Sequence, residues 1–151
     1  MAVAEQLDNK GLLSMFIALS LLNNGVDDFI YLHGFASGSQ SAKAIYLRDR
    51  FAELDINLKV PDLNQGDFFN LTISRQLDRV AALFPPHPNP VTLIGSSLGG
   101  LIAASLAQKH LQVQRLILLA PAFEFLSHWL PQLGSQKLQQ WQTEKYLMVY
   151  H

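Results

Sequence analysis

The stretch that decides the fold is VTLIGSSLGGLIAASLAQKH, residues 91–110. Its first part, residues 91–95, is a short apolar run typical of a strand buried in a sheet. Residues 98–110 are apolar nearly all the way round, which predicts a buried helix. Between the two, Gly95-Ser96-Ser97-Leu98-Gly99 fits the pattern G-x-S-x-G. We therefore expect a strand, a tight turn and a buried helix at this place.

Short apolar runs and amphipathic runs alternate on both sides of this stretch. Further strands are expected at 29–33, 58–61 and 115–120, and further helices at 41–54 and 71–84. The last of these strands is rich in Leu and Ile, as in strands buried on both faces of a parallel sheet. Alternating strands and helices form parallel βαβ units. The sequence thus predicts an α/β fold, a three-layer αβα sandwich around a mostly parallel sheet.

The chain divides into a short extension and one domain. Residues 27–151 are expected to form the domain, and residues 1–26 an N-terminal extension. Apolar residues recur at helical spacing in this extension, at Leu12, Met15, Phe16, Leu19 and Leu22. This spacing favours a packed helix, and the alternative is a targeting signal, although the apolar stretch is too short to span a bilayer. Residues 123–130 and 133–147 are also expected to be helical.

Composition excludes several classes of function. The chain has 151 residues, of which 49% are hydrophobic and 15% charged, with a net charge of -1 and no cysteine. This composition is typical of a globular domain. The absence of a basic cluster argues against nucleic acid as a partner. The absence of cysteine excludes disulfides, thiolate metal sites and a cysteine nucleophile. We expect no metal, no cofactor and no membrane partner, and a cytoplasmic location in the absence of an export signal or span.

Ser97 is the candidate nucleophile. A serine at such a strand-to-helix turn takes a strained backbone conformation that exposes its Oγ, and Gly95 and Gly99 let strand and helix approach closely. The N–H of Leu98, at the start of the helix, would stabilise an oxyanion. The alternative is a turn of small residues in which Ser97 caps the helix.

A second oxyanion donor is expected in the loop after the first strand, His33-Gly34-Phe35-Ala36-Ser37-Gly38. Gly34 would allow the N–H of Phe35 to turn toward Ser97. His33 ends a buried strand and is interpreted as a structural hydrogen-bonding residue, not as the general base. Asp62 is expected to order its own loop through Asn64.

Four motifs together carry a resemblance to a known family. They are YLHGFASG at 31–38, VPDLNQGDF at 60–68, LIGSSLGG at 93–100 and LILLAPAF at 116–123. From about residue 29 to 151 the sequence resembles the α/β-hydrolases, and within them the small bacterial esterases of the YqiA type. The resemblance implies a Ser-His-Asp hydrolase of carboxylic esters and does not imply which ester is the substrate. It implies Ser97 as the nucleophile and the N–H groups of Phe35 and Leu98 as the oxyanion hole.

The end of the chain departs from the family pattern. In this fold the triad acid and histidine follow the serine in that order, and the strands that would precede them have no equivalent before His151. We therefore expect a fold incomplete at its C-terminal side, with self-association through the uncovered edge of the fourth strand. Glu124, His128 and His151 are the available replacements. Candidate walls of an acyl pocket are Phe123, Phe125 and Trp129.

Two functions of different classes remain open at this point. The first is a serine esterase, and acyl transfer to an alcohol would use the same turn. The second is a non-catalytic protein, a truncated homologue or pseudoenzyme that lacks the triad acid and histidine. Without a base, the Ser97 hydroxyl stays protonated and is a weak nucleophile.

Overall fold

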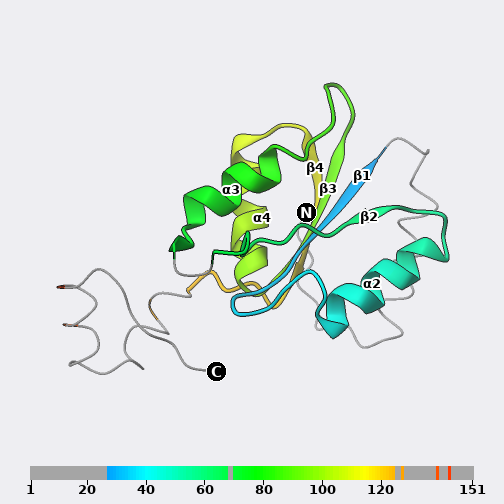
Figure 1. Cartoon of the computed structure of the whole chain (residues 1–151). Helices are drawn as coiled ribbons and strands as arrows, with labels where there is room; N and C mark the ends of the chain where they lie inside the picture. Colours follow the sequence, from blue (N-terminus) through cyan, green and yellow to red (C-terminus); the bar gives the residue numbers. More distant parts are fainter. Residues whose placement is uncertain (1–26, 68–69, 125–126, 128–138, 140–142, 144–151) are drawn as a thin grey trace.

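The structure is a computed structural model, which describes residues 27–67, 70–124, 127, 139 and 143 (Figure 1). Along the chain the elements are β1 (Asp28–Leu32), α2 (Ala42–Ala52), β2 (Leu58–Lys59), α3 (Ile73–Ala81), β3 (Val91–Ser96), α4 (Leu98–Lys109) and β4 (Val113–Leu119). Every strand and helix predicted between residues 29 and 120 is present, with ends that differ by a few residues. The predicted N-terminal extension, residues 1–26, lies outside the described residues.

The four strands form one parallel sheet in the order β2-β1-β3-β4. Parallel neighbours need long crossover connections. Here α2 lies between β1 and β2 in the chain, α3 between β2 and β3, and α4 between β3 and β4. All the strands therefore end at the same edge of the sheet, where the loop after β1 meets the turn after β3.

Helices cover both faces of the sheet (Figure 1). Successive side chains of a strand point to opposite faces. In β1, Phe29 and Tyr31 pack with α2, whereas Ile30 and Leu32 pack with α3 and α4 on the other face. All four side chains are at most 1% exposed. The three-layer α/β architecture predicted from the sequence is confirmed.

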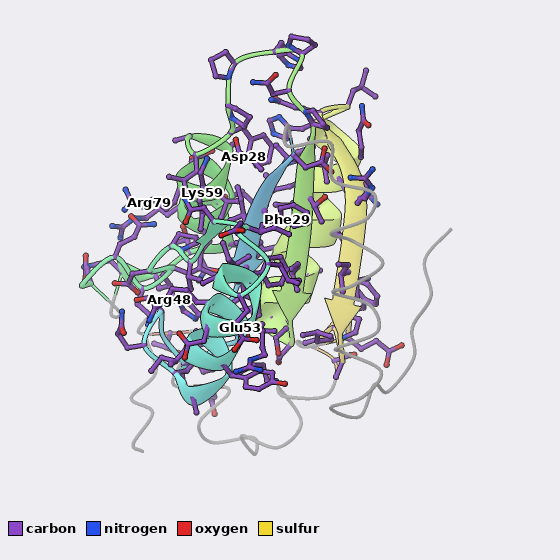
Figure 2. All side chains as sticks on the ribbon, turned by 90° about the vertical axis from the view of Figure 1, so that its right-hand side faces the viewer. Asp28, Phe29, Arg48, Glu53, Lys59 and Arg79 are labelled. Atoms are coloured by element: carbon purple, nitrogen blue, oxygen red, sulfur yellow. The ribbon has the colours of Figure 1, made fainter. Side chains whose placement is uncertain are left out.

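Charged side chains lie on the outer surfaces of the helices and at the sheet margin. Figure 2 looks onto the outer side of α2, where Arg48 lies on the helix and Glu53 directly follows its last residue. At the start of β1, the Asp28 carboxylate pairs with Lys59 of β2 at 2.8 Å (Figure 2). These outer positions leave the interior layers apolar.

The burial predicted for the fourth strand is wrong. Gln114 is exposed and the other residues of β4 are only half-buried. The reason is position, because β4 is the last strand of the described sheet and pairs there with β3 alone. A Leu- and Ile-rich run indicates a strand that prefers burial, but the elements packed beside the strand decide how far its side chains are buried. Self-association through this edge stays a prediction.

Candidate active site

Ser97 forms the turn between β3 and α4. Its backbone has φ 53° and ψ -120°, a combination that non-glycine residues rarely adopt. The side chain is exposed, although the three residues on each side of it are buried. It makes no capping hydrogen bond to α4. The alternative interpretation of Ser97 as a helix-capping side chain is therefore wrong.

Backbone hydrogen bonds hold Ser97 in this conformation. Its N–H donates to the Leu119 carbonyl at 3.1 Å, and its carbonyl accepts from Gly100 at 2.9 Å and from Ala122 at 3.0 Å. A strained residue of this kind costs about 1–3 kcal/mol and persists only where its surroundings fix it. Here the end of β4 and the first turn of α4 fix it from two sides.

Glycines let the elements around Ser97 pack at backbone distance. A Cβ on Gly99 would lie 2.6 Å from the His33 carbonyl oxygen, and a Cβ on Gly95 would lie 2.6 Å from the Gly100 Cα. A Cβ on Gly100 would lie 2.8 Å from the Cβ of Pro121. The roles given to Gly95 and Gly99 from the sequence agree with this packing. Gly100 was not predicted, although the Gly-Gly pair that contains it was a signal.

The loop after β1 lies against Ser97. A Cβ on Gly34 would be 3.2 Å from the Ser97 Cβ and 3.7 Å from its Oγ. Phe35 follows at once in the chain, and Leu98 is the first residue of α4. The two residues expected to supply oxyanion donors are thus the chain neighbours of Gly34 and of Ser97, the two residues that are in contact here.

His33 has a structural role. Its Nε2 accepts the Leu63 N–H at 3.0 Å, which leaves the proton on Nδ1 to be donated to the Gly34 carbonyl at 2.9 Å. The side chain is 1% exposed. Because both ring nitrogens are engaged, the interpretation of His33 as a structural residue is confirmed.

A hydrogen bond joins the loop after β2 to the loop after β1. The Asn64 side-chain amide donates to the Ser37 carbonyl at 2.7 Å, and the Asn64 N–H donates to Asp62 Oδ1 at 3.0 Å. The predicted interaction of Asp62 with Asn64 is confirmed. The bond from Asn64 to Ser37, which joins two loops, was not predicted.

Known proteins share this fold and sequence pattern. The profile of a family described as "Uncharacterised protein family (UPF0227)" matches residues 28–151. The chain belongs to the UPF0227 family. A similar solved structure is the crystal structure of a "Putative hydrolase" from Agrobacterium vitis S4, with a TM-score of 0.67 and 30% identity. The match covers 80% of the UPF0227 chain and 51% of the Agrobacterium protein, so the chain spans about half the length of that protein. None of the curated proteins matches.

The family match and the fold confirm the predicted resemblance to α/β-hydrolases of the YqiA type. In this chain, the features that agree with the resemblance are the parallel sheet covered by helices on both faces and the sharp turn after β3. Family and fold are thus hydrolase-like.

The described part of the UPF0227 chain leaves several candidates from the sequence untested. Phe123 is 55% exposed. Phe125, Trp129, His128 and His151 lie outside the described residues. Glu124 is exposed and has an interaction of its own. His110 ends α4 at the end opposite Ser97, with its ring edge-to-face against Phe84. An acyl pocket and a general base therefore stay predictions.

A polar group that sequence reasoning missed lies directly before Ser97. Lys43 Nζ donates to Ser96 Oγ at 3.1 Å, and the Tyr31 hydroxyl also hydrogen bonds with Ser96. Burial raises the pKa of Tyr31 above its usual value, and the bond with Ser96 offsets part of that effect. The two consecutive serines were a signal for Ser96. Nothing local in the sequence pointed to Lys43, which is a charged residue in the amphipathic helix expected at 41–54.

The described part of the UPF0227 chain was also searched for pockets, metal sites and membrane-spanning helices. A shallow groove between α3 and the C-terminal half of α4 is lined by Leu77, Asp78, Leu106 and Lys109, among others, and does not include Ser97. The described residues contain no group of three or more His, Asp or Glu arranged to hold a metal ion. Among the same residues, no helix is long and apolar enough to cross a membrane.

Proposed function

We propose that this UPF0227 protein is a serine hydrolase that cleaves carboxylic esters, with Ser97 as the nucleophile. The observation that carries the proposal is the strained, exposed position of Ser97 between a buried strand and a buried helix, with Gly34 packed against its side chain. Strain at one non-glycine residue, held by the surrounding backbone, is typical of functional sites. A small-molecule ester as partner and a cytoplasmic location belong to the same proposal.

In the first half of the reaction, Ser97 Oγ attacks the ester carbonyl carbon. The carbonyl oxygen becomes an oxyanion that accepts hydrogen bonds from the N–H groups of Leu98 and Phe35. The tetrahedral intermediate collapses, the alcohol leaves with a proton, and the acyl group stays on Oγ. In the second half, water attacks the acyl carbon and Ser97 is released with its hydroxyl restored. No cofactor takes part in these steps.

The proton of Ser97 has to pass to a general base during attack. His33 cannot take it without losing the hydrogen bond from Leu63. His110 is at the far end of α4. In this proposal the base is His128 or His151, which both lie outside the described residues.

Labelling with a fluorophosphonate probe tests the proposal, because the probe reacts with activated serines. Intact-mass measurement of the purified chain should show one adduct, which is absent in Ser97→Ala. Ser105→Ala is the matched control, since Ser105 lies on α4 and only donates to the Leu101 carbonyl at 2.8 Å. This variant should keep the adduct.

Two results would contradict the proposal. One is an adduct that survives in Ser97→Ala. The other is a folded sample with no adduct and no release of alcohol from simple para-nitrophenyl esters, which would favour the non-catalytic alternative. Alcohols added to an active sample separate hydrolysis from acyl transfer, since transfer would yield a new ester.

A further inference from the structure

Lys43, in the first turn of α2, reaches the residue that precedes Ser97. The helix begins at Ala42, directly after the loop from β1, and Ser41 caps it by accepting the Ala44 N–H. One residue into the helix, Lys43 extends to Ser96 and donates to its Oγ at 3.1 Å. The two residues are 53 positions apart in the sequence. The ammonium is therefore held one residue before the proposed nucleophile.

Nothing in the described surroundings neutralises this ammonium. No carboxylate among the described residues forms an ion pair with Lys43. Its polar neighbours are the hydroxyls of Ser96, which is 7% exposed, and beyond it Tyr31, which is 1% exposed. Because burial raises the pKa of Tyr31, that hydroxyl stays neutral at physiological pH. A full positive charge thus remains at the end of β3.

The ammonium keeps capacity for a ligand. A lysine ammonium has three N–H donors, and among the described residues one of them is used, by Ser96. The side chain is exposed, so solvent and small molecules reach it. The bond to Ser96 also holds the flexible stem, which lowers the entropy lost when an anion binds. Ser96 directly precedes Ser97, and consecutive Cα atoms are about 3.8 Å apart, so the ammonium is held at the residue next to the one that would carry the acyl group.

We propose that Lys43 selects esters that carry an anionic group close to the scissile carbonyl. This inference rests on the proposed role of Ser97. The anionic group belongs either to the acyl chain or to the alcohol, and in both cases it accepts a charge-assisted hydrogen bond from Lys43 Nζ. Substrates of this class are half-esters of dicarboxylic acids and esters of acidic alcohols.

Paired substrates of equal length test the inference. For the acyl side, mono-para-nitrophenyl adipate is compared with para-nitrophenyl hexanoate. For the alcohol side, para-carboxyphenyl hexanoate is compared with its methyl ester. The ratio of kcat/KM for the anionic over the neutral member should fall about tenfold in Lys43→Gln on one of the two sides, since hydrogen bonds to charged groups at exposed sites have this order of effect. Lys43→Arg should keep most of the preference, and added salt should reduce it.

Lys109→Gln is the matched control, because Lys109 is an exposed lysine at the opposite end of α4. It should leave both ratios unchanged. If the neutral ester is hydrolysed through Ser97 and Lys43→Gln changes neither ratio, the inference is overturned and the proposed function stands.

If no ester is hydrolysed, the proposed function fails and the anion site is tested by binding. Calorimetric titration of the folded chain with adipate should then give a Kd about tenfold weaker in Lys43→Gln than in the wild type. Equal affinity, or no binding to the wild type, would overturn the inference. Far-UV circular dichroism of each variant shows whether the fold is intact.

Discussion

Replacing Gly99 by alanine measures how closely α4 packs on the end of β1. The new Cβ would overlap the carbonyl oxygens of Leu32 and His33, the second at 2.6 Å. Ordinary contacts between carbon and a carbonyl oxygen are about 3.3–3.6 Å, so strand and helix have to move apart by roughly 1 Å. Both obstacles are backbone atoms, which cannot swing aside as the end of a side chain can.

The cost follows from these contacts. Overpacking a core costs about 1–3 kcal/mol and occasionally more, and two backbone overlaps place Gly99→Ala at or above the top of that range. Alanine regains about 1 kcal/mol of helix propensity over glycine. We expect a net loss of about 2–3 kcal/mol in the free energy of unfolding, which lowers Tm by roughly 5–10 °C for a chain of this size.

Urea unfolding followed by far-UV circular dichroism gives this free energy. Gly38→Ala is the matched control, because a Cβ there meets no heavy atom within 4 Å. It should stay within about 0.5 kcal/mol of the wild type. A Gly99→Ala protein as stable as Gly38→Ala would refute the close packing that holds the Ser97 turn.

Three further predictions concern other parts of the fold. Phe51→Ala should lower the free energy of unfolding by about 3–5 kcal/mol in urea titrations, because this ring is 1% exposed in the core under α2. Thr72→Ala should cost about 1 kcal/mol in the same assay, since Thr72 Oγ1 accepts the Arg75 N–H at 3.2 Å and caps α3; an unchanged midpoint would show that the cap is not needed. The pKa of Asp67 is lowered, chiefly by the hydrogen bond from the Asn70 side chain. Its stabilising contribution is therefore present above the usual aspartate pKa and lost as pH falls through the lower folded value. Carboxyl NMR titration should show the pKa rise in Asn70→Ala.

The candidate site was predicted as far as its backbone is concerned. Ser97 and the glycines around it follow from one local pattern, because a sharp turn between a buried strand and a buried helix tolerates few residue types. Gly34 was predicted from a second local pattern, the short loop after the first strand. Its approach to Ser97 follows from parallel strands that end at one edge of the sheet.

The side chains that reach across the fold could not be predicted in this way. Lys43 lies on the polar side of an amphipathic helix, where the periodicity predicts exposure to solvent and no particular contact. Its bond to Ser96 depends on where α2 is placed on the sheet. The same holds for the bond from Asn64 to Ser37, which depends on the relative position of two loops.

The sequence by itself determined the succession of strands and helices along the chain, the parallel α/β class and the serine turn. Each of these is encoded by neighbouring residues, through the alternation of apolar side chains and the backbone freedom of glycine. Only the tertiary structure decided that His33 uses both ring nitrogens, that β4 is half-buried and that an ammonium lies beside the serine turn. These features arise between residues far apart in the chain, and no local period records which long side chain meets which hydroxyl once the layers have packed.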